Sequence, residues 1–207
     1  MSYSSLISIT PNAEKVIAYC ARVSNSKNQA SEKIQKLLKY CIKHSHWSVF
    51  EQASATIEIN TNRAIARQLL RHRSFCFQEF SQRYSEVPDE PFLFEARLQD
   101  LENRQNSIDN AGEFKKEWFK FEQRKIWKLA YASYRGALDR GIAKEQARAL
   151  LPEGMTPTKL YMTGNLRCWY HFCKLRKGNG SQKEVAEIAN QAIDILKQEC
   201  PILFSLV

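Results

Sequence analysis

The sequence predicts an α+β fold in which several helices flank a small β-sheet. Residues 53–60 alternate polar and apolar side chains, as a strand with one buried face does, whereas residues 34–42 and 185–196 place apolar side chains at helical spacing. The length of 207 residues is enough to bury one core without a second domain. We therefore expect residues 1–207 to form a single, helix-rich domain.

Two helix starts are predicted near the N-terminus. Thr10 followed by Pro11 is typical of a cap with proline at the first helical position, and it comes directly after a short strand at residues 5–9. Ser31 is the expected cap of a second, amphipathic helix, which ends near His44.

Helical spacing returns after the strand at 53–60. Residues 62–70 predict a helix, while prolines, asparagines and acids indicate a surface connection over 88–112. A long helix is expected from Glu113 to about Arg140, where Gly141 stops it. Its aromatic side chains, which we expect in the core or in a subunit interface, are Phe114, Trp118, Phe121, Trp127, Tyr131 and Tyr134.

Three more helices are predicted near the C-terminus. A short one carries Arg148, and another covers residues 165–175. Ser181 with Glu184 is typical of a capping box at the start of the last helix. The apolar positions that we expect this helix to bury are Val185, Ile188, Ala189, Ala192 and Leu196.

The composition favours anionic ligands in a cytoplasmic protein. Lys plus Arg is 31 and Asp plus Glu is 22, which gives a net charge of +9. No apolar run approaches roughly 18 residues and no leader pattern is present, so we expect neither a membrane span nor secretion. The six cysteines form no CxxC pair and have no His-rich partner, which predicts reduced thiols and no metal site.

The densest chemistry lies in residues 71–84, which combine three arginines, a histidine, a carboxylate, two serines and four aromatic side chains. Arg63, Arg67 and Arg71 recur every four residues, so on a helix they form one cationic stripe whose charges repel by ~0.2–0.5 kcal/mol per pair. We expect water or a bound anion to relieve this repulsion. A solvated basic face is the alternative for the stripe taken alone.

Arg71-His72-Arg73, followed after seven residues by Ser81, resembles the signature of the flavin-dependent thymidylate synthases, here extended by Glu79. Other segments are similar to family segments in family order and lie at residues 20–24, 44–51, 67–68, 147–148 and 165–176. The resemblance therefore covers most of the chain, and residues 88–143, a connection plus a long helix, are its least informative part. It implies the fold of this family.

The resemblance also implies the reaction. In the family, methylenetetrahydrofolate supplies a carbon that converts dUMP to dTMP, and FAD that NADPH has reduced supplies the hydride. Such chemistry needs cationic donors around anions and flat walls for three ring systems. It further implies a homotetramer with shared active sites, with small-molecule partners and neither nucleic acid nor membrane.

Seven residues match family positions around dUMP. We expect Arg148 and Arg176 to act as catalytic donors that stabilise charge on the uracil, and His46 to lie near the flavin ring, where the family histidine is linked to folate access. Ser81 is expected to bind and not to act as a nucleophile. The residues expected at dUMP are Gln68, Arg71, Glu79, Ser81, Arg83, Arg148 and Arg176.

A second set matches family positions around FAD. Gln78 and His171 stand where the family commonly has asparagine, and residues 177–180 stand where it often has histidine. These departures all concern the flavin site. The residues expected to bind the cofactor are Ser24, Ser48, Glu51, Arg71, His72, Arg73, Gln78, Glu79, Asn165, Arg167 and His171.

Two other functions fit parts of the sequence. A cysteine-dependent methyltransferase would need a nucleophilic thiol, and Cys76 is the candidate because neighbouring arginines could lower its pKa. A basic nucleic-acid-binding protein is supported only by the arginine stripe and the net charge. The set of Gln68, Glu79 and Asn165 argues against the latter, since a phosphate-backbone binder does not need those groups.

Overall fold

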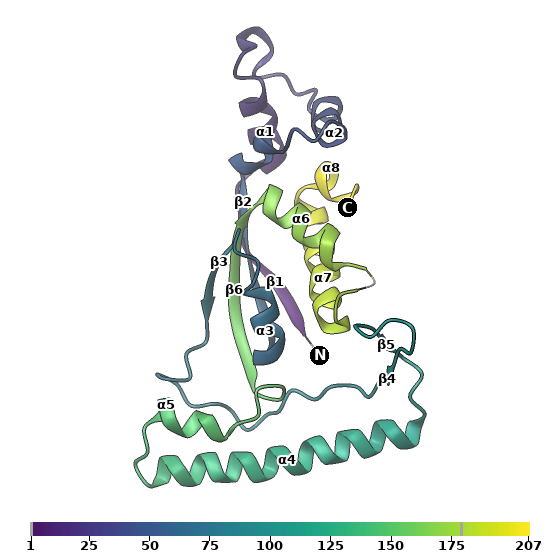
Figure 1. Ribbon diagram of the computed structural model, residues 1–207. Helices are drawn as coiled ribbons and strands as arrows, with labels where there is room; N and C mark the ends of the chain where they lie inside the picture. Colours follow the sequence, from purple (N-terminus) through teal and green to yellow (C-terminus); the bar gives the residue numbers. More distant parts are fainter. Residues whose placement is uncertain (1, 179) are drawn as a thin grey trace.

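A four-stranded sheet occupies the middle of an elongated molecule, with two short helices at one end and one long helix across the other (Figure 1). The computed structural model describes residues 2–178 and 180–207. The elements, in chain order, are β1 (Tyr3–Ile9), α1 (Ala13–Ala21), η1 (Ser26–Asn28), α2 (Gln35–Lys43), η2 (Trp47–Gln52), β2 (Ser54–Asn62), α3 (Arg63–Leu69), β3 (Cys76–Glu79), β4 (Leu98–Gln99), β5 (Ser107–Ile108), α4 (Glu113–Asp139), α5 (Lys144–Ala147), η3 (Arg148–Leu150), β6 (Pro157–Asn165), α6 (Leu166–Arg176), α7 (Lys183–Glu199) and α8 (Pro201–Phe204).

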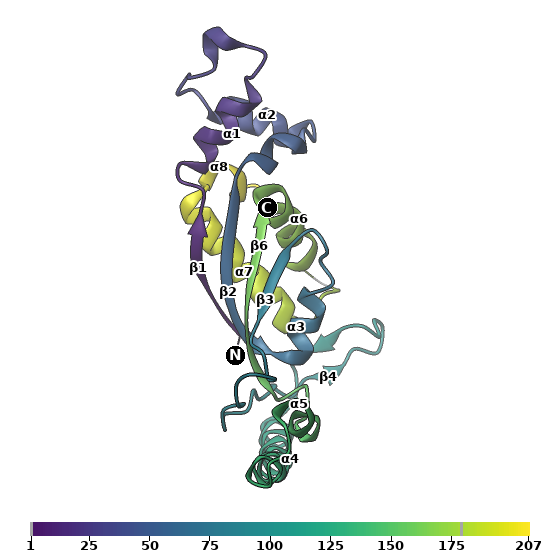
Figure 2. The same ribbon diagram turned by 90° about the vertical axis from the view of Figure 1, so that its left-hand side faces the viewer.

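The sheet has the order β1-β2-β6-β3, and all its neighbouring strands are antiparallel. The alternation predicted for the second strand is confirmed, because Ala55, Ile57 and Ile59 are buried in the main core. Figure 2 shows the strands in front of α6 and α7, so these helices cover one face of the sheet. The opposite face carries polar side chains such as Glu58 and Tyr161. The predicted α+β class is confirmed.

The central strand β6 has no counterpart among the predicted elements. Its buried positions Leu160 and Met162 alternate with partly exposed ones, but Gly164 interrupts the apolar pattern. This glycine has a packing reason, because a Cβ atom there would lie 2.5 Å from the Cδ1 atom of Phe75. Glycine in a strand often marks such a close approach.

Both predicted helix starts near the N-terminus are wrong. Asn12, with a left-handed φ of 52°, precedes α1, while the Thr10 hydroxyl accepts a hydrogen bond from the Ser54 N–H at 3.0 Å. The Ser31 hydroxyl accepts from the Lys33 N–H at 3.3 Å, and α2 begins later, at Gln35. Short hydroxyl side chains compete for nearby backbone groups in this way.

The predicted capping box of the last helix is also wrong. Gln182 occupies the cap position of α7, and its side chain makes no capping hydrogen bond. The Glu184 carboxylate instead pairs with Arg97 at 2.8 Å. A buried guanidinium competes successfully with a backbone N–H because the bond is charge-assisted. The positions predicted to face the core are all buried, namely Val185, Ile188, Ala189, Ala192 and Leu196.

The long helix α4 forms where it was predicted, and Gly141 follows it with a φ of 78°. Trp127 and Tyr134 lie in a second, smaller hydrophobic cluster against the segments around α5. The expected core position is wrong for three of the aromatic side chains, because Phe114, Trp118 and Phe121 are 84%, 57% and 62% exposed in the single chain. For them, a subunit interface remains a prediction.

The connection before α4 is only partly a surface segment. Phe94 packs against the main core, and its backbone exchanges two hydrogen bonds with the Gln123 side chain, at 2.8 and 2.9 Å. Proline and acid content indicated a loop but could not indicate this anchoring, because it depends on α4. Across residues 2–178 and 180–207, none of the helices combines the length and apolarity that crossing a lipid bilayer requires.

Glu14 ties the two ends of the chain together. Its buried carboxylate accepts a hydrogen bond from the Leu203 N–H at 2.8 Å, so it satisfies the start of α8 from the first turn of α1. Burial raises the pKa of Glu14 above its ordinary value of 4.5, and bonds from the backbone of Leu203 and Ile202 partly offset that shift.

We expect Glu14→Ala to lower the free energy of unfolding by about 1.5–3 kcal/mol, because buried N–H groups lose a charged acceptor. Glu14→Gln keeps an acceptor oxygen and should cost less. Since the folded pKa of Glu14 is raised, its contribution to stability is present below pH ~4.5 and is lost as the pH rises through the folded pKa. Chemical denaturation between pH 4 and 8 should therefore show the free energy of unfolding of Glu14→Gln rising relative to that of the wild type as the pH increases. A difference between the two proteins that does not change with pH would contradict this.

Candidate active site

The helix α3 leads into the signature stretch and carries Arg63 and Arg67, the first two arginines of the predicted stripe. The Asn62 side chain caps α3 by accepting a hydrogen bond from the Ile65 N–H at 3.0 Å. Arg63 forms an ion pair with Glu79 at 3.1 Å, and Arg67 forms one with Glu153. Two arginines of the predicted stripe thus have carboxylate partners in the same chain, and relief of the repulsion by water or a bound anion remains a prediction for Arg71.

His72 and Arg176 meet although 104 residues separate them. The Arg176 Nε atom donates a hydrogen bond to the His72 Nε2 atom at 3.0 Å, and the imidazole stands edge-on to the Phe172 ring at 4.9 Å. Burial first, and the charge of Arg176 second, lower the pKa of His72 below its ordinary value of 6.5. Because the Arg176 N–H donates to Nε2, that nitrogen is an acceptor, so the imidazole in this contact is neutral and carries its proton on Nδ1.

Gln68 belongs to the same neighbourhood. It lies in the last turn of α3, four residues before His72, and its Nε2 atom donates to the Gln182 Oε1 atom at 2.6 Å. We refer to Gln68, His72 and Arg176 as the middle cluster. It contains predicted dUMP and FAD residues side by side.

We expect the burial of His72, together with the neighbouring charge of Arg176, to make stability depend on pH. Because the folded pKa of His72 is lowered, its contribution to stability is present above pH ~6.5 and is lost as the pH falls through the folded pKa. His72→Gln keeps an acceptor but does not titrate in this range. Denaturation curves between pH 5 and 8 should show the free energy of unfolding of the wild type falling relative to that of His72→Gln on acidification. A difference that does not change with pH would disprove the lowered pKa of His72.

A second group, which we call the lower cluster, lies around α5. Arg83 pairs with the Glu145 carboxylate at 3.4 Å, and the Arg148 Nε atom donates to the Glu145 carbonyl at 3.2 Å. The Ser81 hydroxyl accepts from the Arg83 N–H at 3.3 Å. Glu79 completes this cluster through its pair with Arg63. A cavity of about 350 Å³ is lined here by arginines and glutamates, among them Arg63, Arg67, Glu145, Arg148 and Glu153.

The helix α3 stands between the two clusters. Arg63 and Arg67 line the lower cavity, whereas Gln68 contacts the start of α7. These contacts show that Arg67 and Gln68 face different sides of α3, consistent with the angle of about 100° between consecutive side chains on a helix. Within one chain the residues predicted to bind dUMP therefore fall into two groups, with Gln68 and Arg176 in one and Ser81, Arg83 and Arg148 in the other. Arg71 is exposed beyond the end of α3.

The third group, the upper cluster, lies where β6 passes into α6. The Asn165 side chain caps α6 by accepting from the Cys168 N–H at 2.9 Å, and Arg167 forms an ion pair with Glu51. Three of these four residues, Asn165, Arg167 and Glu51, were predicted to bind FAD. Asn165 therefore has a structural role that its assignment to the cofactor did not include.

Aromatic contacts hold the remaining members of the upper cluster. The His171 ring meets the Trp47 ring edge-on at 4.5 Å, and burial, followed by the charges of Arg167 and Lys174, lowers the pKa of His171. His46 is exposed and lies against Tyr40 at 5.7 Å. Ser48, in the short helix η2, is also exposed.

The upper and lower clusters lie at opposite ends of β6. A strand of nine residues spans roughly 26 Å, so the two clusters cannot contact one small ligand together. The other predicted cofactor residues are dispersed. Arg73 and Ser24 are exposed, and Gln78 lies on the open face of the sheet, opposite Tyr161. Asn179, within the predicted departure from the family, lies outside the described residues.

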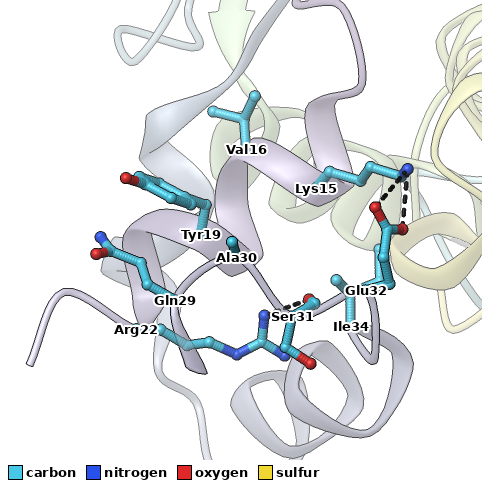
Figure 3. A pocket seen from close by; sticks show the side chains of 9 residues that line it. All are labelled: Lys15, Val16, Tyr19, Arg22, Gln29, Ala30, Ser31, Glu32 and Ile34. Atoms are coloured by element: carbon cyan, nitrogen blue, oxygen red, sulfur yellow. Dashed lines mark hydrogen bonds and ion pairs between the residues drawn. The ribbon is translucent and has the colours of Figure 1, made fainter. Parts of the chain in front are cut away.

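A further cavity of about 320 Å³ lies at the α1 end of the molecule and contains none of the predicted site residues (Figure 3). Its charged groups are engaged with each other or with the backbone. Lys15 pairs with Glu32 at 3.0 Å, and the Arg22 guanidinium donates to the Ser31 carbonyl at 2.7 Å. The predicted site residues gather instead around the signature region, which is therefore the candidate active site.

Sequence reasoning missed Arg97, Gln182 and Glu184, which support the middle cluster. The Gln182 Nε2 atom donates to Glu184 at 2.9 Å, and Arg97 pairs with the same carboxylate. Arg97 lies 87 residues from Glu184, in the connection with the weakest family resemblance. No local pattern in the sequence could have joined them.

Solved structures share this fold. The UMP/dUMP methylase PolB from Streptomyces cacaoi, bound with 5-Br dUMP, superimposes with a TM-score of 0.88 at 25% identity over 99% of this chain and 93% of that one. Its complex with 5-Br UMP gives 0.87 at 26% identity, over 99% and 92%. The fold thus places the chain in a structural class that includes a nucleotide methylase.

Sequence comparison is more specific. The family model described as thymidylate synthase complementing protein matches residues 5–202. A probable flavin-dependent thymidylate synthase of Paramecium bursaria Chlorella virus 1 is 50% identical over 190 residues, 91% of this chain and 88% of that protein. One from Synechocystis sp. is 50% identical over 188 residues, 91% and 86%. The chain belongs to the flavin-dependent thymidylate synthase family, which confirms the resemblance, the enzyme class and the use of a flavin.

Proposed function

We propose that the protein converts dUMP to dTMP, with methylenetetrahydrofolate as carbon donor and FAD, reduced by NADPH, as hydride source. The observation that carries the proposal is the contact between Arg176 and His72. This contact joins Arg176, which is expected to bind dUMP, to His72 of the signature, which is expected to bind FAD. Residues assigned to the nucleotide and to the cofactor therefore meet in one cluster. We also propose that the enzyme works in the cytoplasm, with neither nucleic acid nor membrane as partner.

In this proposal the arginines bind charge and stabilise it as it develops. The Arg176 Nε atom is engaged with His72, which leaves the two Nη groups to donate toward the uracil carbonyls as C5 becomes nucleophilic. Arg83 and Arg148, with the Ser81 hydroxyl, provide charge-assisted bonds for phosphate and sugar oxygens. No enzyme nucleophile is required.

The chain also has donors that fit FAD. Arg71 and Arg73 are exposed and form no ion pair with the part of the chain that the structure describes, so their guanidinium groups are free for a pyrophosphate. Arg167, Glu51 and Asn165 would hold another part of the cofactor. When bound, the flavin supplies the hydride.

We further propose a homotetramer in which each active site takes residues from more than one chain. The division of the dUMP residues between the middle and lower clusters supports this, because α3 stands between the two in one chain. If the middle cluster of one subunit faces the lower cluster of another, the two together contain the residues expected to bind dUMP, apart from Arg71. Symmetric association of this kind also supplies walls that a small chain lacks.

The purified protein should be yellow, and NADPH should bleach its flavin absorption under anaerobic conditions. This result is expected because Arg71, Arg73 and the upper cluster offer donors to FAD. Absorption spectra before and after addition of NADPH measure it, with NADH as the comparison reductant. A folded protein that is colourless and takes up no added FAD would refute the cofactor assignment and favour the nucleic-acid-binding alternative.

A further inference from the structure

A chain of hydrogen bonds runs from the protein interior to Gln68. Its buried end is the pair of Arg97 and Glu184, whose side chains are 10% and 8% exposed. Two guanidinium nitrogens of Arg97 contact the two carboxylate oxygens of Glu184, at 2.8 and 3.0 Å. Such a bidentate pair fixes the carboxylate in place, and its oxygens can only accept hydrogen bonds from their neighbours.

This carboxylate determines how the next side chain is oriented. The Gln182 Nε2 atom donates to the Glu184 Oε2 atom at 2.9 Å, since the opposite orientation would place two acceptors against each other. The Gln182 Oε1 atom therefore points to Gln68 and accepts from its Nε2 atom at 2.6 Å. The amide orientations, which are otherwise ambiguous, follow here from the fixed charge.

The consequence concerns the face that Gln68 offers to a ligand. Its amino group is committed to Gln182, whereas its Oε1 atom accepts no hydrogen bond from the residues that the structure describes. A carbonyl oxygen repels a phosphate oxygen but accepts from a hydroxyl or an N–H group. The atom that Gln68 offers to the nucleotide is therefore an acceptor.

We propose that Arg97, Glu184 and Gln182 are positioning residues that hold the Gln68 carbonyl oxygen toward the nucleotide, where it accepts a hydrogen bond from a donor on the sugar or the uracil. The inference rests on the proposed function, because it assumes that Gln68 meets dUMP. It also assigns a role to the connection before α4, which supplies Arg97.

The first experiment measures binding of dUMP to the FAD-loaded protein by titration calorimetry. Gln68→Ala should weaken dUMP binding about 3- to 10-fold, as expected for one neutral hydrogen bond, and should leave competition by inorganic phosphate unchanged. Two analogues identify the donor, one lacking the 3′-hydroxyl and one methylated at N3. The wild type and Gln68→Ala should bind one of these analogues equally well.

Three results would overturn the orientation. Phosphate competition that weakens as much as dUMP binding would mean that Gln68 donates to the phosphate. A full effect of Gln68→Ala with both analogues would mean that it contacts neither donor, and no effect on dUMP would mean that it contacts nothing. If the wild type itself bound no dUMP, the proposed function would fail, which is a distinguishable outcome.

The second experiment tests the positioning role with Gln182→Leu, which removes both amide bonds without unpairing the buried Arg97 and Glu184. It should weaken dUMP binding in the wild type and have no further effect in Gln68→Ala, because it acts through Gln68. Gln198→Leu, an exposed glutamine on the same helix, is the matched control and should leave binding unchanged. An equal effect of Gln182→Leu in both backgrounds would exclude positioning.

Discussion

Arg176→Ala is expected to lower kcat for dTMP formation by about 100- to 1,000-fold, which corresponds to ~2.7–4 kcal/mol, the usual loss for a donor to developing charge. The Nη groups of Arg176 are the ones that His72 leaves available. Arg176→Lys keeps the charge but loses the planar fork, so it should recover little of the rate. Single-turnover oxidation of the reduced flavin in the presence of dUMP and methylenetetrahydrofolate measures the effect, and flavin content serves as the folding control.

Cys76→Ser is the matched comparison and should retain most of the activity. Cys76 is exposed on β3 and pairs in register with Thr163 on the open face of the sheet, whereas α6, which carries Arg176, lies on the other face. A thiolate mechanism at the middle cluster of the same chain is therefore not supported. An inactive Cys76→Ser enzyme with normal flavin content would restore the thiol mechanism and remove the role assigned to Arg176.

Co-expression of Arg148→Ala with Arg176→Ala should restore activity that neither variant has alone. The two arginines lie in the lower and the middle cluster, on opposite sides of α3. In a random mixture, half of the paired subunits combine both variants, and one of their two shared sites carries neither lesion. Activity should then reach roughly one quarter of the wild-type value per site. Differential tags isolate the mixed assemblies for assay.

The control is co-expression of Gln68→Ala with Arg176→Ala. Gln68 lies in α3 four residues before His72, which Arg176 contacts, so we expect both residues to serve the same site. Every site in such a mixture then keeps one of the two lesions, and no recovery is expected. Recovered activity in this control mixture would contradict the proposed division of the site. The absence of recovered activity in confirmed mixed assemblies of Arg148→Ala and Arg176→Ala would contradict it as well. A monomer at the assay concentration would rule out shared sites.

The sequence alone determined the elements whose signal is local. The alternation in β2 and the apolar spacing of α4 and α7 each repeat within a few residues, and hydrophobic burial then selects the matching element. The signature from Arg71 to Ser81 was equally readable, because its residue types and spacing occur in one continuous stretch. These features were sufficient to predict the fold class and the family.

Other local signals led to wrong predictions because a distant partner was stronger. Thr10 contacts Ser54 and does not cap α1, and Glu184 pairs with Arg97 instead of completing a capping box. The strand β6 was missed since its glycine, which weakens the pattern, is needed only because Phe75 packs against it. In each case the deciding group is far away along the chain.

The arrangement of the candidate site was likewise decided by the tertiary structure. Residues assigned to one ligand are divided by α3, and His72 and Gln68 reach Arg176 and Gln182 across separations of 104 and 114 residues. A sequence motif specifies which side chains are present and their order. Which of them meet, and which atom of Gln68 is left for a ligand, depends on how helices pack on the sheet and on where a buried charge fixes its neighbours.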